Sequence, residues 1–321
     1  VYKHAVMLAD DLLGAIAHGA QKVVVGRQHV TLQIKLDHGL HLIQRGQLAL
    51  HIGALCFGLS GIFGKLALAA PLVIVCGRAL FAVLALAPLA WRQGSRARPG
   101  ALRILALCGA GLLLGGHWWS FFVAIKISGV AVATLGFASF PAFTVLLEAL
   151  LFGERIQRAE WLVVALVCCG LLLVTPAFSL EASTSQGLLW AVLSGLLFAA
   201  LSVSNRATTP GVAPAQAAFW QSLAILLVSL PMAAPLLLEI RAVDWLWLAL
   251  LGVLCTALAH SLFVASLSVL NARTASVVFA LEPVYGILLA WWLFQEQPGL
   301  RMLFGAGLII LATLLSARLQ R

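Results

Sequence analysis

Long apolar segments follow one another from residue 48 almost to the end of the chain, and their length limits the possible folds. Each reaches roughly 20 residues, which is the length an α-helix needs to cross the hydrocarbon core of a membrane. Backbone groups in lipid need internal partners, so these continuously apolar segments indicate helices, whereas a transmembrane β-barrel would show alternation. We therefore predict an all-α integral membrane protein with ten transmembrane helices, at residues 48–67, 71–91, 102–124, 129–151, 159–175, 187–205, 214–238, 245–267, 272–294 and 299–317.

The apolar body repeats itself at an offset of about 142 residues. Pro141 and Glu154 recur 142 residues later as Pro283 and Glu296. Similarity at a fixed period indicates a repeated structural unit. We expect two five-helix repeats, at residues 47–178 and 186–318, which in a membrane protein build one transport path between them. Further matches at offsets of 143 and 134 join Pro71, Arg78 and Pro88 to Pro214, Gln221 and Pro231, and Leu59-Ser60-Gly61 to Leu193-Ser194-Gly195.

The charges are few and unevenly placed. The chain is 62% hydrophobic and only 10% charged, which is too little charge for a water-exposed surface. The net charge of +9 would suit a nucleic-acid partner, but Lys and Arg outside the spans gather at alternate connections, as the positive-inside rule describes. The opposite connections carry only Lys126, Arg241 and Arg301. We therefore predict no nucleic-acid partner and two cytoplasmic termini. Because each repeat has an odd number of helices, the repeats should be inverted relative to each other.

Residues 1–46 differ from the rest of the chain and contain five of its eight histidines. No apolar stretch here is long enough to span a membrane, and Asp10 and Asp11 interrupt any signal-peptide pattern. Two interpretations stay open. The segment is either a cytoplasmic extension with amphipathic pieces, or translated sequence upstream of a true start near Gln47, which the initial Val favours. The irregular histidine spacing predicts no metal site.

Residues suited to catalysis or to a cofactor are scarce. Beyond residue 46 the acidic and histidine residues form no HExxH or GxSxG motif, and Gly64-Lys65 lacks the earlier glycine of a phosphate loop. We predict that the chain is not an enzyme and has no cofactor. The cysteines show no metal-binding spacing and are expected to pack as small apolar residues. They are Cys56, Cys76, Cys108, Cys168, Cys169 and Cys255.

Several of these segments resemble a known family. GALCFGLSGIFGKLAL in the first span, Pro71 with Arg78 in the second, and LEPVYGILLAWWLFQE in the ninth are similar to the EamA half of the drug/metabolite transporter superfamily. The resemblance covers roughly residues 48–318. It implies a ten-helix carrier of the bacterial inner membrane, with a central cavity lined by helices one, three, four, six, eight and nine. It also implies export of amino acids or other small metabolites by alternating access.

Two charged residues within the spans are the first candidates for a site. Inserting a charge at mid-helix into a membrane costs of order 3 kcal/mol, so a charged residue within a span is expected to have a structural or functional role. Glu282 lies about ten residues into the ninth span, near the membrane midplane, and Pro283 would free a carbonyl beside it. We predict a substrate or proton site at Glu282, with a structural ion pair as the alternative. Arg78 lies at similar depth and either pairs with Glu282 or holds an anionic substrate group through its planar guanidinium.

Other candidates are neutral at ordinary pH. His117 and His260 occupy matching places in the repeats and could couple protons, or stay neutral and hydrogen-bonded within the bundle. Trp118 and Trp220 lie deeper than interfacial tryptophans and are candidates for an aromatic wall. The predicted polar lining consists of Gln221, Ser60 and Asn205. Lys65 and Glu148 near span ends are expected to be interfacial, and Glu154 and Glu296 to organise turns.

Alternative functions remain. A multidrug or nucleotide-sugar carrier belongs to the same class, whereas a non-transporting membrane adaptor or receptor and an intramembrane enzyme come from others. Arg78 is the one inward cation suited to an anionic substrate, so small zwitterionic or neutral metabolites are favoured. We expect a monomer in the lipid bilayer, with a dimer left open.

Overall fold

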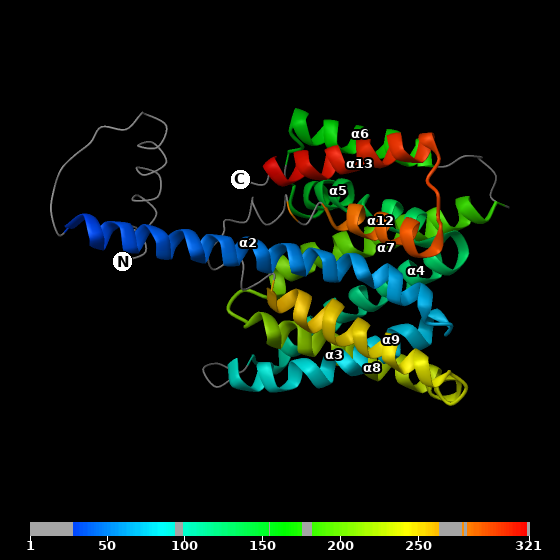
Figure 1. Ribbon diagram of the computed structural model, residues 1–321. Helices are drawn as coiled ribbons and strands as arrows, with labels where there is room; N and C mark the ends of the chain where they lie inside the picture. The colour runs from blue at the N-terminus through cyan, green and yellow to red at the C-terminus, as the bar shows by residue number, and fades with distance from the viewer. Residues whose placement is uncertain are drawn as a thin grey trace. The chain divides into compact units, whose positions relative to one another are not determined.

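The computed structural model describes residues 28–93, 99–153, 155–174, 182–262, 278 and 281–319 (Figure 1). The chain divides into two compact units, residues 1–44 and 45–321. Of the first unit, residues 28–44 are described and are helical. All that follows concerns the second unit, which contains both predicted repeats.

The described residues form helices and no strand, which confirms the all-α prediction for this part of the chain. Seven helices are long and apolar enough to cross a membrane. The predicted count of ten spans and the inversion of the repeats are not established by this and stay predictions. The helices are α2 (Gln28–Leu66), α3 (Pro71–Gln93), α4 (Ala101–Phe137), α5 (Phe140–Phe152), α6 (Arg158–Val174), α7 (Ser183–Thr208), α8 (Pro214–Leu237), α9 (Ala242–Gly252), the π-helix η1 (Val253–Leu258), α12 (Glu282–Phe294) and α13 (Leu300–Leu319).

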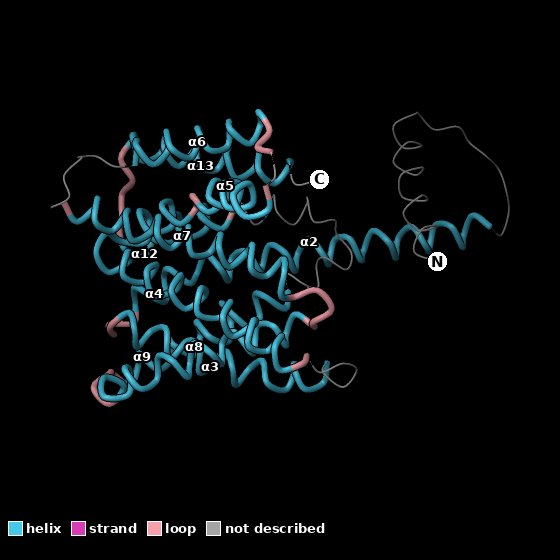
Figure 2. Tube along the Cα trace, turned by 180° about the vertical axis from the view of Figure 1, so that it is seen from behind, coloured by secondary structure: helices cyan, strands magenta, loops and turns pink. Residues whose placement is uncertain are grey.

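Two helices, α4 and α7, form the centre of the bundle. They pack along each other, and α5 and α12 pack beside them on α7 and α4. Figure 2 shows α6 and α13 paired on one side of this centre and α3, α8 and α9 on the other. The centre is therefore made of helices from both predicted repeats.

The longest described helix after α2 is interrupted where the sequence predicts a turn. Gly129 in α4 has φ 85° and ψ 174°, a backbone conformation outside the helical region that suits glycine. This interruption separates the predicted third span, 102–124, from the start of the fourth, 129–151. The first N–H groups after the interruption belong to Val130 and Ala131, and both donate to the carboxylate of Glu296 at 3.2 and 3.1 Å.

A second interruption precedes each of the repeated prolines. Helix α4 ends at Phe137 and α5 begins at Phe140, so Pro141 lies in the first turn of α5. Helix α12 begins at Glu282, so Pro283 lies in its first turn. Proline is tolerated there because the missing N–H has no partner in a first turn. Glu282 is thus the first residue of α12, and residues 272–277 and 279–280 of the predicted ninth span lie outside the described residues, so the predicted depth of Glu282 in that span stays a prediction.

Close approach of α4 and α8 depends most on Gly111. A Cβ atom at Gly111 would lie 2.6 Å from the carbonyl oxygen of Gln221, whereas a Cβ at Gly109 in the same helix would meet nothing within 4 Å. Small residues of this kind let transmembrane helices approach each other closely. Gly111 is thus a packing residue and Gly109 is its natural control.

We expect Gly111→Ala to lower the free energy of unfolding by about 2 kcal/mol, because α4 and α8 must separate. Gly109→Ala should be neutral or stabilise by up to about 1 kcal/mol, since alanine favours the helix. Thermal unfolding in detergent, followed by tryptophan fluorescence, measures both. Equal melting temperatures for the two variants would contradict the packing.

Candidate functional site

Arg78 is the most deeply buried cation of the described residues. Its side chain projects from α3 and is 4% exposed. Its Nε donates to Thr256 Oγ1 at 2.9 Å, and its Nη2 donates to the carbonyl oxygen of Cys255 at 3.3 Å. The guanidinium carbon lies 4.0 Å from the ring centroid of Trp118, which gives a cation–π contact. The described residues offer its other N–H groups no partner, so they remain able to bind an anion.

The π-helix η1 supplies both acceptors for Arg78. A π-helix bonds each N–H to a carbonyl five residues back, and such turns are frequent at functional sites. The Thr256 hydroxyl donates to the carbonyl of Leu251, five residues earlier, at 3.0 Å. That same hydroxyl accepts from Arg78, so its direction is fixed from both sides. Thr256 therefore holds the guanidinium in one orientation.

Glu282 lies near Arg78 without pairing with it. The two charges interact electrostatically, but no hydrogen bond or ion pair joins them. The described part of the chain gives the Glu282 carboxylate no partner at all. The reason is the packing: α3 lies against α8, α9 and η1, whereas α12 lies against α4. The backbone of Glu282 instead approaches α2, where a Cβ at Gly58 would lie 3.1 Å from its carbonyl oxygen.

His117 adjoins this site through its neighbour Trp118 and is tied to α7. Its Nδ1 lies 2.7 Å from Ser194 Oγ, and the same hydroxyl donates to the His117 carbonyl at 3.1 Å. Because the hydroxyl proton is used in that bond, Nδ1 is the donor to Oγ. The imidazole packs against Phe137 and Phe198, with ring centroids 4.9 and 5.0 Å away. His117 is thus a buried, hydrogen-bonded histidine.

The remaining predicted residues lie outside this group of contacts. Gln221 Nε2 donates to Asn205 Oδ1 at 2.7 Å, so these two candidates bind each other. The ring of Trp220 packs against Phe219 at 5.4 Å. Within the described ranges, His260 has no hydrogen bond, and the buried Ser60 hydroxyl has none either. Their roles as site residues stay predictions.

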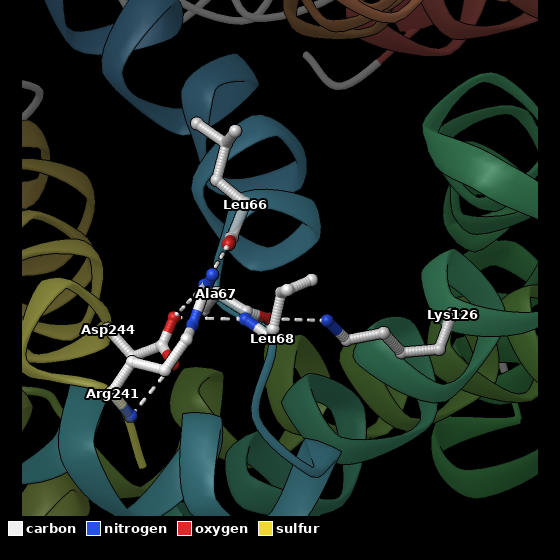
Figure 3. Close-up of polar contacts among 6 residues, drawn as sticks. All are labelled: Leu66, Ala67, Leu68, Lys126, Arg241 and Asp244. Atoms are coloured by element: carbon white, nitrogen blue, oxygen red, sulfur yellow. Dashed lines mark hydrogen bonds and ion pairs between the residues drawn. The ribbon is translucent and has the colours of Figure 1, made fainter.

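A separate polar cluster secures the end of α2 (Figure 3). Helix ends leave carbonyls without partners, and cations stabilise them. The buried carboxylate of Asp244 accepts from the Leu68 N–H at 3.0 Å and from Arg241 Nη2 at 2.7 Å. These hydrogen bonds raise the pKa of the Arg241 guanidinium, so this cation stays charged. The carbonyls of Leu66 and Ala67 accept from Arg241 Nη2 and Lys126 Nζ respectively.

Lys65 and Glu296 form an ion pair near this end of α2. We expected Lys65 to reach the membrane interface alone and Glu296 to organise a turn. Glu296 does so, since its carboxylate also accepts the N–H groups that follow Gly129. An open pocket of about 420 Å³ adjoins the pair and includes neither Arg78 nor Glu282. Glu148, the other predicted interfacial charge, pairs with the half-exposed Arg206 at 2.8 Å.

Comparison with known proteins identifies the family. The sequence model of the EamA-like transporter family matches the chain twice, at residues 44–175 and 185–318. The chain belongs to the EamA-like transporter family. It is therefore a multi-pass membrane transporter rather than an enzyme, and the repeat found in the sequence is a repeat of the EamA unit.

Several relatives of this EamA protein carry transporter names. An uncharacterized transporter of Archaeoglobus fulgidus is 28% identical over 62% of this chain and 71% of its own length. An S-adenosylmethionine uptake transporter of Rickettsia conorii is 28% identical over 64% of this chain and 68% of its own. Protein RarD of Salmonella typhi is 35% identical, but over only 26% of this chain and 28% of its own length.

A solved crystal structure shares the fold of this EamA protein. It aligns over 86% of this chain and 99% of its own chain, with a TM-score of 0.57 and 18% sequence identity. At this identity the likeness concerns the fold alone.

Sequence reasoning missed the residues that orient Arg78. Thr256 and Cys255 lie in an apolar stretch, VLCTAL, which gives no sign that its helix is wound as a π-helix. It also missed the acceptors at the end of α2, because backbone carbonyls have no sequence signature. The isolated acid Asp244 at a helix start was the one available signal.

We expect Thr256→Val to lower the free energy of unfolding by about 1–3 kcal/mol, because it leaves the buried Nε of Arg78 without its acceptor. Thr256→Ser keeps the hydroxyl and should lie close to the wild type. Thermal unfolding of the two variants makes the comparison. If Ser proves as damaging as Val, the threonine methyl group rather than its hydroxyl is what matters.

Proposed function

We propose that this EamA protein is a secondary transporter that exports small zwitterionic metabolites, such as amino acids, by alternating access. It would do so in the bacterial inner membrane, with both termini in the cytoplasm. The observation that carries the proposal is the nearness of two opposite charges, the buried Arg78 and the partly buried Glu282, which form no ion pair with any residue that the structure describes. The cost of burying charges is accepted in membrane proteins mainly at functional sites.

The geometry around Arg78 suits a carboxylate. Arginine binds planar anions through paired N–H groups, and the N–H groups that Thr256 and Cys255 leave free are available for this. Trp118 covers one face of the guanidinium at 4.0 Å, and the N–H groups of the guanidinium point along its edge, where a carboxylate would bind. A carboxylate bound there would neutralise a charge that forms no ion pair with the residues the structure describes.

Glu282 suits the ammonium group of the same substrate. Its carboxylate has no partner in the described part of the chain, and it lies close enough to Arg78 for their charges to interact. A zwitterion placed between them would satisfy both charges at once. A plain organic cation would leave Arg78 unpaired and a plain anion would leave Glu282 unpaired, so the multidrug and nucleotide-sugar alternatives are less well supported.

The name of one group of relatives agrees with this substrate class. S-adenosylmethionine, which the Rickettsia relatives are named for taking up, contains an amino-acid group with a carboxylate and an ammonium. That name concerns uptake, whereas we propose export. Both directions are compatible with a carrier driven by gradients, so direction must be measured separately.

The test is transport into proteoliposomes, with labelled S-adenosylmethionine and a mixture of labelled L-amino acids as probes. We expect Glu282→Gln to lower the rate by about 10- to 100-fold, the effect of losing a hydrogen bond to a charged group. The amount of folded variant protein should equal that of the wild type. Glu148→Gln removes a carboxylate whose pair with Arg206 is half-exposed, and it serves as the matched control with an unchanged rate.

Substrate-specific losses would separate the two charges. Arg78→Lys keeps the positive charge but loses the planar guanidinium. It should therefore lower the transport rate of probes with a free carboxylate more than the rate of the corresponding amides. Wild-type rates for Glu282→Gln with every transported probe would rule out Glu282 as the working residue. Comparing vesicles that hold the protein in opposite orientations, under the same gradient, establishes the direction of transport.

A further inference from the structure

The open pocket at one end of the bundle contains a second pair of opposite charges. Its volume of about 420 Å³ suits a small ligand, and it lies where α2 and α12 end and α7 and α13 begin. Lys65 and Glu296 both line it, and their side chains are 33% and 18% exposed. The pocket therefore offers a ligand charges of both signs. The other polar side chains of its lining are those of Ser128, Thr184 and Gln297.

The pocket already holds a carboxylate, that of Glu296. This carboxylate accepts from Lys65 Nζ and from the N–H groups of Val130 and Ala131. It also lies against Gly129, where a Cβ atom would be 2.8 Å from its Oε1. The missing side chain of Gly129 thus leaves the space that the carboxylate fills. Because three donors hold Glu296, it keeps two of them when Lys65 turns to another anion.

The ion pair can separate without the unwinding of a helix. Glu296 lies on the connection between α12, which ends at Phe294, and α13, which begins at Leu300. Its neighbour Gln295 has a φ of 55°, in the left-handed region that residues other than glycine seldom adopt. Lys65 comes from α2, and its Nζ lies 4.5 Å from the ring centroid of Phe294. Movement of two partly exposed side chains is therefore enough to admit a ligand between them.

A buried aromatic ring separates this pocket from Arg78. The guanidinium carbon of Arg78 lies 4.0 Å from the ring centroid of Trp118 and 6.0 Å from that of Phe122, one turn further along α4. Phe122 is fully buried, and a Cβ at Gly64 in α2 would clash with its ring. Ser128 of the pocket lies about 9 Å beyond Phe122 along α4. The ring of Phe122 therefore lies between the level of Arg78 and the level of the pocket.

We infer that this pocket is a second binding site for the zwitterionic substrate, in which Lys65 binds the carboxylate and Glu296 binds the ammonium group. The chemistry of the ligand rests on the proposed function. A zwitterion between the two side chains replaces one ion pair by two, so every charge keeps a partner. A plain anion would take Lys65 from Glu296 and leave that carboxylate without a cation, and a plain cation would leave Lys65 without an anion.

The second site binds more weakly than the first. Lys65 and Glu296 are partly exposed, and ion pairs near water contribute little to binding, whereas Arg78 is buried. A ligand in the pocket must also displace an existing ion pair, which the site at Arg78 does not require among the described residues. A weak site at the end of the bundle suits the step at which a transported molecule enters or leaves.

Protection of a thiol placed in the pocket tests the site. Thr184→Cys and Gln297→Cys each put a thiol in its lining, and Leu238→Cys puts one in the connection between α8 and α9, at a position that is 90% exposed. The full chain in lipid nanodiscs reacts with a charged methanethiosulfonate reagent, with S-adenosylmethionine and L-amino acids as probes. The chain without these substitutions gives the background from its own cysteines.

We expect a zwitterionic probe to slow the reaction at both pocket positions. At ten times its half-saturating concentration the slowing should be about tenfold, because the reaction rate follows the fraction of empty sites. The rate at Leu238→Cys should not change. If no probe protects either pocket position, or if Leu238→Cys is protected equally, the second site is wrong.

Variants of the two charged sites locate the protecting molecule. Lys65→Met should abolish the protection of Thr184→Cys, and Lys65→Arg, which keeps the positive charge, should retain it. Glu282→Gln should retain it too, because Glu282 does not line the pocket. Protection that is lost with Glu282→Gln and kept with Lys65→Met would place the probe beside Arg78 and overturn the inference.

Failure of this inference can be distinguished from failure of the proposed function. Protection in the pocket without transport of any probe into proteoliposomes would support the second site and contradict the proposed transport. Transport of a probe that protects neither pocket thiol would support the proposed transport and overturn the second site.

Discussion

The buried guanidinium of Arg78 is the interaction on which the centre of this bundle depends. A cation in an apolar interior needs acceptors that do not come from water. In this protein they come from the backbone and one hydroxyl of η1, with the Trp118 ring on one face. The π-helix is what makes this possible, because its wider turn directs Thr256 toward Leu251 and Arg78 together. The buried guanidinium therefore needs the acceptors that η1 supplies, and the π-helix places those acceptors beside it.

The shared features of the two repeats build the scaffold, and the unshared ones build the site. Both repeats interrupt a helix just before a proline, at Pro141 and at Pro283, and both let a glycine-containing helix cross the interruption. At the position after the break, however, one repeat has Phe140 and the other has Glu282. Phe140 joins a cluster of packed rings, whereas no described residue pairs with the Glu282 carboxylate.

The features of the fold and of the site that could be predicted are those determined by residues close together in the sequence. Apolar length gave the helices, and Gly129 lies at a predicted turn because glycine adopts its positive φ readily. The burial of Arg78 and Trp118 follows from their depth. The contact between Arg78 and Trp118 depends on which helices are neighbours, and so does the absence of a pair between Arg78 and Glu282. The pattern of apolar residues does not show which helices pack together. That α12 begins at Glu282 could not be predicted either, because a proline in an apolar span is compatible with a kink and with a first turn.

The charged contacts at the end of α2 give the two ends of the bundle different energies. Lys65 pairs with Glu296, and Asp244 holds the N–H of Leu68. By the offsets of the repeat, the positions equivalent to Lys65 and Asp244 are Ala199 and Ala101, which can form neither contact. A carrier whose repeats exchange conformations would then break the contacts of Lys65 and Asp244 to open one end, and the more exposed pair of Arg206 with Glu148 to open the other. Salt screens exposed ion pairs more than partly buried ones, so the two openings would respond differently to the same solution. Because the contacts at the two ends differ, a scaffold built from two similar repeats can favour one of its two conformations over the other.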